Sequence, residues 1–596
     1  MKLSLLELLV AYSLSRVAWD VAHALRRRRV LTAAPPATDG SRVEEFASAP
    51  RLGPFEGVND LFSRTRTYVK VLLEHSRMLA VYEQHRKDGW FRYGAPPASF
   101  AELAEHPALR ALLELRSSSS SARGELRSTL RFEADGAVLP TYLPIEEGAA
   151  AALGALSLAA AELYELRTGR AQRVVVSQSG AGLTTAQYLF LYAQPRGRWQ
   201  GLHGFDATMA AEGVVKPHRK AYRCGDGGWV FLHGGFPRLK KGITDFLGCE
   251  CTVDGIGAAV AKWDSLELES AMQAAGLAAT KCRTPAEWRE SEQGKAVQAL
   301  PPVCVEARPS NAARFDVDSL KAPAARALPA VASRPLSDVV VVDFSHVIAS
   351  PVVGRSLVDH GATVIKVVSA QRPRREMFDC ETNHGKNVLT LELSTDEGRA
   401  RLWELLRTAD VLIDGFANGA LARHGLPIDE VLQRNPHLVY LDLSCFGHVG
   451  PLAHGKGFQQ NANFACGVAG IDDEELLAYQ LVSQVDYATG FLGAYGVILG
   501  LIERQLAAEQ GRAIGGVLVR TSLCQAATWM ASLGARPPSR REWFTRVTRL
   551  LWASDRRSTT VGDPAWLKWP PRQRPSGPPR ALLTASEGPP LFHEEV

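Results

Sequence analysis

The stretch LSDVVVVDFSHVIASPVVGRSLVDHGATVIKVV, from Leu336 to Val368, decides the fold of the second half of the chain. Its four consecutive valines, Val339–Val342, predict a strand that is buried on both faces, as strands of parallel sheets are. Pro351 suits the first turn of a helix, and Gly361 suits the left-handed residue that ends one. A second apolar run, Thr363–Val368, follows. The stretch therefore predicts a strand, a crossover helix and a second, parallel strand.

The same alternation continues downstream. Further strands are expected around Val388–Leu393, Val411–Ile413 and Leu438–Leu443, with a helix from Thr395 between the first two. Alternating strands and helices predict an α/β fold with a doubly wound parallel sheet. Ligands of such folds bind at the carboxyl ends of the strands, so we expect the turns Ser345–Ser350 and Asp414–Gly419 to line a ligand crevice.

The chain also contains an internal repeat. Ile145–Ala181 and Val485–Ala526 each hold an acid seven positions before a glycine, a long helix rich in small residues, a basic turn with glycine and a β-branched strand. The two acids are Glu147 and Asp486. Shared order over this length predicts a duplication within the chain.

Composition divides the chain into six segments, because linkers are rich in Ala, Pro and Ser. The expected segments are an N-terminal amphipathic helix and linker (1–50), a helical region of unclear role (51–135), a degenerate first copy that includes a smaller α+β domain (136–306), a linker (307–335), a second copy with the parallel sheet and the active site (336–535), and an irregular Pro-rich tail (536–596).

Length and composition exclude several classes of protein. A chain of 596 residues with 46% hydrophobic and 22% charged residues is typical of a soluble, multi-domain protein. A net charge of +5 is too small at this length to indicate nucleic-acid binding. The motifs GxGxxG after the first strand, GxxxxGK[ST], GxSxG and HExxH are absent. Dinucleotide, P-loop, esterase and zinc-protease functions are therefore disfavoured.

Cysteine usage and hydropathy bear on location. The nine cysteines form no CxxC pair and no zinc-ligand spacing, so we expect neither disulfides nor a metal site. Free thiols favour the cytoplasm, with mitochondrial targeting left open. The sequence has no run of about 18 uncharged apolar residues, so we expect no membrane-spanning helix. The apolar stretch before Arg26–Arg29 is interpreted as a docked amphipathic helix; a transit peptide and a helix lying on a membrane are the alternatives.

The order of motifs in the second half resembles that of the family III CoA-transferases, the group that contains formyl-CoA and carnitine CoA-transferases and 2-methylacyl-CoA racemases. The motifs are DFSHVIASP, GATVIKV, NHGKNVLTLELSTDEGR, ADVLIDGF, LARHGL, NPHLVYLDLSCFGHVGP, KGF and VDYATGFLGAYG, within Leu336–Ala535. In the first half, Tyr222–Leu247 is similar to the small domain of that fold and Trp263–Pro301 to its C-terminal part. The chain thus resembles two-copy members with complementary, degenerate halves. This implies either an intrachain pseudo-dimer or a homodimer.

An acid at the start of an apolar helix often serves only as a cap or as a partner of the helix dipole. The resemblance implies more for Asp486, because the matching aspartate of the family attacks the acyl-CoA carbonyl and then carries CoA as an aspartyl thioester. CoA and acyl-CoA are expected as substrates with a small carboxylic acid, and no permanently bound cofactor or metal is expected. Glu147 holds the matching place in the first copy. We expect that copy to be catalytically silent, because no sheet unit precedes it.

The resemblance also implies a set of residues that bind CoA, whose phosphates require cations and amide donors. They are His346, Val347, Ala349, Arg372, Lys386, Phe416, Arg423 and Lys456. Arg372, with its neighbours Arg374 and Arg375, replaces an arginine that the family often has where this chain has Ser369. For each lysine or arginine, a solvated surface charge is the alternative interpretation.

Three functions are compatible with these residues to different degrees. Racemisation requires two groups that exchange an α-proton from opposite faces. Racemases of the family place a histidine and an acid where this chain has Phe458 and Gln459, so racemisation is disfavoured. The leading hypothesis is transfer of CoA from an acyl-CoA to a carboxylic acid. The alternative is a non-catalytic protein that binds CoA or a protein partner, which Gln459, the changed DGFANG turn and the short tail favour.

Overall fold

The structure is a computed structural model. It describes residues 96–97, 99–116, 126–139, 141–187, 192–193, 200–201, 217–309, 328–330, 332–370, 376–471, 476–477, 483–512, 514–534, 542 and 545–546. The expected N-terminal helix, Arg372 with its neighbouring arginines and the end of the tail lie outside these residues. The chain divides into two compact units, Met1–Arg77 with Ala193–Gln200, and Met78–Tyr192 with Gly201–Val596. The account below concerns the second unit.

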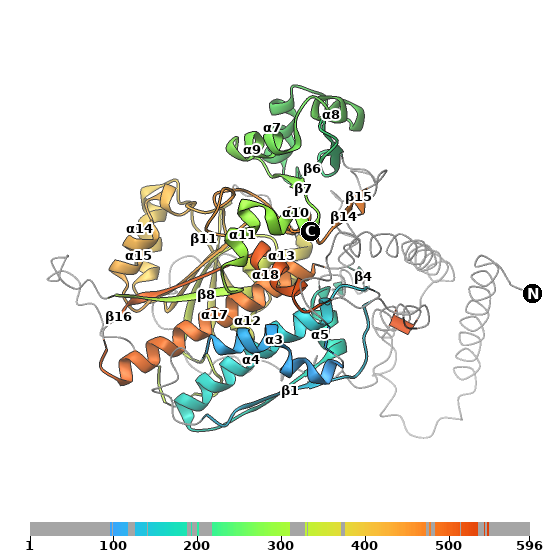
Figure 1. The fold of residues 1–596 in the computed structure, drawn as a ribbon. Helices are drawn as coiled ribbons and strands as arrows, with labels where there is room; N and C mark the ends of the chain where they lie inside the picture. The colour runs from blue at the N-terminus through green and yellow to red at the C-terminus, as the bar shows by residue number, and fades with distance from the viewer. Residues whose placement is uncertain are drawn as a thin grey trace, which may run out of the picture. The chain divides into compact units, whose positions relative to one another are not determined.

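A seven-stranded sheet forms the centre of the second copy. Its strands are β8 (Val303–Pro309), β9 (Val340–Phe344), β10 (Thr363–Val368), β11 (Asn387–Thr390), β12 (Val411–Asp414), β13 (Val439–Ser444) and β16 (Ile514–Ser522). Their order is β11-β10-β9-β12-β13-β16-β8, and all neighbours are parallel except β16 and β8 (Figure 1). Numbered along the chain, the parallel strands follow the order 3-2-1-4-5-6 of the doubly wound nucleotide-binding fold. The predicted parallel sheet is confirmed, and the strand order reverses between β9 and β12.

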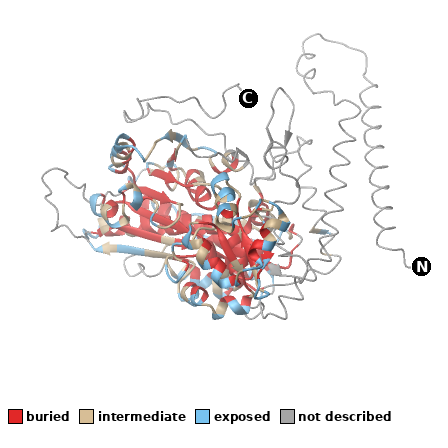
Figure 2. Ribbon diagram, turned by 90° about the horizontal axis from the view of Figure 1, so that it is seen from above, coloured by how far each residue is buried: buried red, intermediate tan, exposed pale blue. Residues whose placement is uncertain are grey.

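Helices cover both faces of this sheet. They are α12 (Ala349–Asp359) and α17 (Gln484–Glu509) on one face, and α14 (Asp396–Leu406) and α15 (Ile428–Arg434) on the other. Leu402 and Leu432 of the second pair pack with Leu412 of β12 in one buried cluster. On the opposite face, a Cβ at Gly496 of α17 would come within 2.6 Å of Val303 and Val519. Glycine is therefore required at this position for α17 to lie directly on the sheet. Figure 2 shows the buried residues gathered in the sheet and its flanking helices.

The two copies share a helix–strand–helix unit. In the first copy it is α4 (Ile145–Thr168), β2 (Arg173–Ser177) and α5 (Gln178–Thr184), and in the second it is α17, β16 and α18 (Leu523–Ala531). Ser177 accepts the N–H of Gly180 at the start of α5, and Ser522 accepts the N–H of Gln525 at the start of α18. Helices α4 and α17 pack side by side (Figure 1). The common order and the common serine cap support the predicted duplication.

The first copy retains part of the sheet, contrary to expectation. Strand β1 (Thr129–Glu133) pairs in parallel with β2 along its full length, as β13 pairs with β16. The expectation that no sheet unit precedes Glu147 is therefore wrong. Strand β1 also lies before residue 136, where the first copy was expected to begin. The run TLRFE alternates polar and apolar side chains over only five residues, so pairing with β2, rather than a strong local pattern, makes it a strand.

The first half also contains the expected small α+β unit. It consists of the antiparallel strands β5 (Ala221–Arg223), β6 (Trp229–Leu232) and β7 (Ala279–Cys282) with the helices α7 (Pro237–Leu247), α8 (Val253–Val260) and α9 (Ser265–Ala274). Helices α10 (Pro285–Glu290) and α11 (Glu292–Gln298) then lead to β8, which joins the sheet of the second copy. The first half thus completes the fold of the second.

The remaining described elements are short. They are η2 (Phe100–Glu105), α3 (Pro107–Glu114), β3 (Tyr192–Ala193), β4 (Gln200–Gly201), α13 (Glu376–Thr382), η8 (Ala422–His424), α16 (Gln459–Ala465), β14 (Gly470–Ile471) and β15 (Leu476–Leu477).

By length and apolar composition, α4 and α17 are both candidates to cross a membrane. The apolar stretch of α17 is wholly buried inside the protein, and that of α4 is mostly buried. Burial in the core accounts for both sequences, because a helix that is apolar on all sides suits a protein interior as well as a lipid bilayer.

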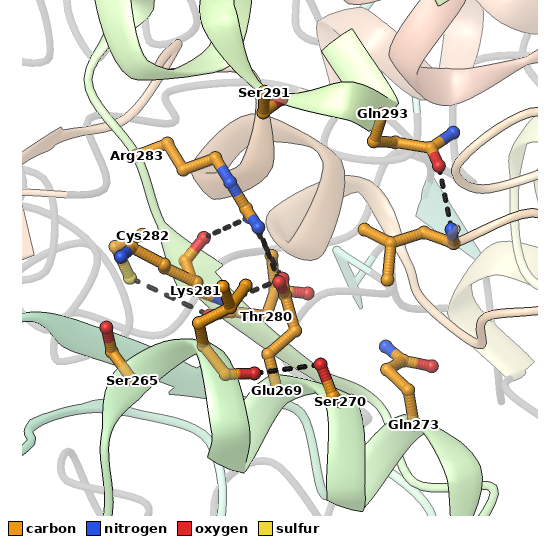
Figure 3. Close-up of polar contacts among 12 residues, drawn as sticks. Ser265, Glu269, Ser270, Gln273, Thr280, Lys281, Cys282, Arg283, Ser291 and Gln293 are labelled. Atoms are coloured by element: carbon orange, nitrogen blue, oxygen red, sulfur yellow. Dashed lines mark hydrogen bonds and ion pairs between the residues drawn. The ribbon is translucent and has the colours of Figure 1, made fainter. Parts of the chain in front are cut away.

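Two glutamines fix the small unit and its following helices to the loop after β13. Gln293 of α11 donates to the carbonyl of Phe446 at 2.8 Å and accepts the N–H of Leu452 at 2.7 Å. Gln273 of α9 donates to the carbonyl of Lys456 at 2.9 Å and accepts its N–H at 2.7 Å. Both glutamines appear in Figure 3. Each amide uses its donor and its acceptor, so the loop is held in one position relative to the small unit.

A buried ion pair holds the small unit together beside these contacts. Both guanidinium nitrogens NH1 and NH2 of Arg283 donate to the carboxylate of Glu269, with 7% and 2% of the two side chains exposed (Figure 3). The N–H of Lys281 also donates to Glu269 at 2.8 Å, and the N–H of Arg283 donates to the carbonyl of Phe464 in α16. The pair therefore connects α9, β7 and the second copy.

We predict that Glu269→Gln lowers the free energy of unfolding by about 3–5 kcal/mol, because it leaves Arg283 buried without a counter-charge. Asp245→Asn is the matched control, since it removes the acid of the exposed Lys241–Asp245 pair in the same unit and costs less than about 1 kcal/mol. Urea unfolding followed by circular dichroism measures both. Equal losses in the two variants would contradict a structural role of the buried pair.

Candidate functional site

Asp486 is the third residue of α17, and a side chain from α16 holds this end of the helix. Its backbone N–H donates to Oε1 of Gln459, the first residue of α16, at 2.9 Å. Burial raises the pKa of the Asp486 carboxyl to about 7. The first turn of a helix presents unpaired N–H groups and the positive end of the dipole, which favour negative charge there. Asp486 is thus a carboxylate in surroundings of low polarity that still favour developing negative charge.

The residue after Asp486 anchors the same turn. The Tyr487 hydroxyl donates to Oε2 of Glu381 at 3.0 Å, and Arg355 donates to the other carboxylate oxygen at 3.2 Å. Glu381 belongs to α13 and Arg355 to α12, and the Glu381 side chain is 3% exposed. This network fixes the start of α17 to the helix that follows β9.

The turn between β9 and α12 lies beside α17. Val347 has φ 70°, a left-handed conformation that is strained for a β-branched residue. Ala349 begins α12, and a Cβ at Gly490 of α17 would come within 2.7 Å of its carbonyl oxygen. The structure thus brings together the start of α17 and the turn that carries His346, Val347 and Ala349. Strain of this kind persists only where the surroundings enforce it.

Lys386, which the resemblance implies as a CoA-binding residue, contacts this turn from inside the protein. Its ammonium group is fully buried and donates to Oδ2 of Asp343 at 2.8 Å and to the carbonyl of Pro351 at 2.7 Å. Lys366 donates to the carbonyl of Ser345 at 2.7 Å. Burial alone would raise the pKa of Asp343, but the two lysines lower it. The motif NHGK does not by itself show that the ammonium group of Lys386 forms an ion pair with the buried carboxylate of Asp343.

Aromatic residues of the small unit pack on Phe458, the residue before Gln459. Phe458, next to Gln459, stacks on His233 with ring centroids 4.1 Å apart and lies 5.5 Å from Phe236. Phe236 in turn lies 5.2 Å from His346 of the crevice turn. The sequence does not reveal this layer, because Phe236 and Phe458 are more than 200 residues apart and meet only in the folded chain.

Three cations from separate elements lie near one another. Burial, and then the neighbouring charges of Arg238 and Arg423, lower the pKa of Lys456. Arg238 is at the start of α7, Arg423 lies in η8, and both are exposed. Like charges brought together in this way favour a polyanionic ligand. The sequence analysis names Arg423 and Lys456 as expected CoA-binding residues but not Arg238, whose only signal is the basic run PRLKK.

The turn after β12 completes the crevice at the point where the strand order reverses. The N–H of Phe416 donates to Oδ1 of Asp414 at 3.2 Å, and the Tyr440 hydroxyl donates to Oδ2 at 3.0 Å. Burial, followed by the in-register neighbour Asp442, raises the pKa of Asp414 to about 7. Phe416 is partly buried against the core beneath α14 and α15.

The matching acid of the first copy has different surroundings. Glu147 is the third residue of α4, as Asp486 is of α17, but the deeply buried acid is its neighbour Glu146. Glu146 accepts the N–H groups of Val138 at 2.6 Å and Leu139 at 2.7 Å. In the described residues, no group of three or more His, Cys, Asp and Glu side chains is arranged to hold a metal ion.

Comparisons with known proteins fit this geometry. The family model described as CoA-transferase family III matches residues 102–332 and 336–543. An acetyl-coenzyme A transferase of Hypoxylon pulicicidum is 29% identical over 310 residues, 49% of this chain and 51% of its own length. A probable fatty acyl-CoA transferase of Mycobacterium tuberculosis is 30% identical over 191 residues, 29% of this chain and 48% of its own. The chain spans about half the length of these curated relatives.

Among solved structures, a CaiB/BaiF family protein from Brucella suis is 26% identical, with a TM-score of 0.28, and the match covers 33% of this chain and 55% of that one. The family-model match, by contrast, extends over both halves and most of the sequence. The chain belongs to CoA-transferase family III.

Proposed function

We propose that the protein transfers CoA from an acyl-CoA to a carboxylic acid, with Asp486 as the nucleophile. The observation that carries this proposal is the placement of a half-buried carboxylate at the start of α17, a helix that packs closely on the turn before α12, with its backbone held by Gln459 beside the aromatic layer. Family membership and the names of the relatives support the reaction class.

The proposed reaction conserves charge and needs no redox partner. The Asp486 carboxylate attacks the thioester carbonyl, the C–S bond breaks, and a mixed anhydride and CoA thiolate form. The thiolate attacks the Asp486 carbonyl carbon, releases the first acid as its carboxylate and leaves an aspartyl-CoA thioester. The acceptor carboxylate repeats the two steps in reverse order, so that Asp486 is regenerated and a new acyl-CoA leaves.

The surroundings of Asp486 suit these steps. A carboxylate with a pKa near 7 is more nucleophilic than an ordinary one and remains partly ionised at neutral pH. Oxyanions form at both carbonyl carbons, and the positive end of the α17 dipole favours negative charge at the first turn of this helix. Gln459 holds the backbone of Asp486 in place through its side-chain carbonyl.

We infer that CoA binds along the turns after β9 and β12, with its phosphates at the three cations. We infer that His346, Val347 and Ala349 line its path at the turn after β9, and that Phe416 does so after β12. Arg238, Arg423 and Lys456 would pair with its phosphates. Lys386 would act indirectly, by holding Asp343 and the carbonyl of Pro351 beneath the turn.

A non-catalytic CoA-binding protein is the alternative function. Gln459, in place of an acid that some transferases of the family carry, favours it. The role of Gln459 as a support of Asp486 and the aromatic layer beside the site favour the enzyme. We further propose that α4 and α17 form an intrachain pseudo-dimer, that the Glu147 copy is silent and that the protein acts in the cytoplasm.

Asp486→Asn is predicted to lower CoA transfer by at least about a thousandfold, or about 4 kcal/mol in the barrier, because an amide cannot form the anhydride. CoA affinity and the unfolding transition should be unchanged, since asparagine retains the size of aspartate and the backbone N–H that donates to Gln459. Glu147→Gln is the matched control and should retain activity. Parent-like turnover by the Asn variant would show that Asp486 is not the nucleophile.

The rate should also depend on pH in a defined direction. Only the ionised carboxylate attacks, and its pKa is about 7, so exchange of a labelled free acid into its acyl-CoA should rise about tenfold from pH 6 to pH 8 and then level off. Rates under subsaturating acyl-CoA measure this dependence. A profile that is flat over this interval would contradict the assigned nucleophile.

Arg423→Ala and Lys456→Ala should each weaken CoA binding by about 1–2 kcal/mol, with the effect reduced at high salt, because the contacts are charge-assisted. Lys241→Ala is the control: this lysine is exposed on α7 and paired with Asp245. Isothermal titration with CoA gives the affinities. Unchanged affinity in both test variants would refute the cationic cluster as the phosphate site.

A further inference from the structure

Lys456 is a partly buried lysine whose ammonium group forms no ion pair with any residue that the structure describes. It lies in the loop between β13 and α16, which forms neither helix nor strand over residues 445–458. The two buried lysines beneath the crevice turn differ in this respect, because Lys366 and Lys386 both pair with Asp343. The position of Lys456 therefore depends on other contacts, and the end of α9 supplies them.

Gln273, the second-last residue of α9, holds the backbone of Lys456. Its Oε1 accepts the N–H of Lys456 at 2.7 Å, and its Nε2 donates to the Lys456 carbonyl at 2.9 Å. Nε2 also donates to the carbonyl of Ala279 in β7 at 2.7 Å. Both donors and one acceptor site of this amide are thus used. The side chain cannot turn without breaking three hydrogen bonds, so the backbone of Lys456 is fixed relative to α9 and β7.

Gly276, which follows the end of α9, makes room for the ammonium group of the same lysine. It has φ 73°, and its N–H donates to the carbonyl of Gln273 at 2.9 Å, as in a left-handed helix cap. A Cβ at this position would come within 2.9 Å of Nζ of Lys456. The carboxyl end of a helix is the negative end of its dipole and favours a cation there. One helix end therefore fixes the backbone of Lys456 and accommodates its charge.

We propose that the end of α9 is a positioning element for CoA, in which Gln273 and Gly276 set the Lys456 ammonium group where it meets a phosphate. This inference rests on the proposed function, which assigns Lys456 to the phosphates of CoA. A cation that the fold holds in place loses less conformational freedom on binding than a freely rotating lysine, so its charge-assisted contact is stronger. Gln273 and Gly276 act through Lys456 and have no contact with CoA of their own. The first half of the chain thereby supports a binding residue of the second.

Two glycines in the same conformation give a matched test. Gly276 and Gly248 each follow a helix end with a positive φ, 73° and 61°, but nothing among the described residues lies within 4 Å of a Cβ at Gly248. Asparagine tolerates this conformation better than most residues with side chains. We expect Gly276→Asn to weaken CoA binding at least about threefold, since its side chain displaces the ammonium group, and Gly248→Asn to stay within about twofold of the parent. Isothermal titration with CoA gives both affinities.

A double-mutant cycle shows whether these residues act through Lys456. Gln273→Met keeps the length of the side chain but removes the three hydrogen bonds. It should raise the dissociation constant of CoA about three- to tenfold, with kcat at saturating acyl-CoA nearly unchanged. In a Lys456→Ala background, Gln273→Met and Gly276→Asn should each change the affinity by less than about twofold, because the group through which they act is gone.

Effects of equal size with and without Lys456 would overturn the inference, because they would show a structural role alone. Parent-like affinity in both Gln273→Met and Gly276→Asn would overturn it as well. Parent-like affinity in Lys456→Ala would instead refute the phosphate site, and the inference with it. Urea unfolding checks that each variant is folded, and the pair of glycine variants decides the test if Gln273→Met does not fold.

Discussion

The close approach of α17 to the parallel sheet is the constraint on which the rest of the structure depends. Glycines in this helix replace side chains that would otherwise meet the sheet: a Cβ at Gly496 would come within 2.6 Å of β8 and β16, and one at Gly490 within 2.7 Å of the start of α12. These contacts fix the position of α17 on the sheet. They thereby also fix the position of Asp486, the third residue of the helix. The network of Tyr487, Glu381 and Arg355 secures the same position from the side of α12 and α13.

The two halves of the chain supply different parts of one fold. The second half provides the sheet, the crevice turns and Asp486. The first half provides β8 at the edge of that sheet, the helix α4 that packs on α17, and the small unit with its aromatic residues. Gln273 and Gln293 hydrogen-bond the small unit to the loop between β13 and α16. These contacts fix the position of the small unit relative to that loop. This division fits a first copy whose described residues form only β1 and β2 as a parallel pair.

Much of this fold could be predicted from the sequence, because strong local patterns report buried parallel strands. The run Val339–Val342 identified β9, and Thr363–Val368 has the bounds of β10. The position of Asp486 on a helix start was also predicted, although its chemical role came from the resemblance. The features that were missed depend on contacts between distant segments: β1 becomes a strand by pairing with β2, Arg238 joins Lys456 across the fold, and Lys386 is buried against Asp343. Local sequence carries no signal for such contacts.

The central claim is that the Asp486 carboxylate becomes covalently acylated, and chemical trapping tests it most directly. Incubation of the protein with pentanoyl-CoA and hydroxylamine, followed by proteolysis and mass spectrometry, examines the peptide that contains Asp486. The account predicts a hydroxamate at Asp486 that forms only when acyl-CoA is present, because hydroxylamine captures the anhydride or the thioester at that carbonyl. An unmodified Asp486 in protein that is turning over acyl-CoA, or a hydroxamate at a different carboxylate, would contradict it.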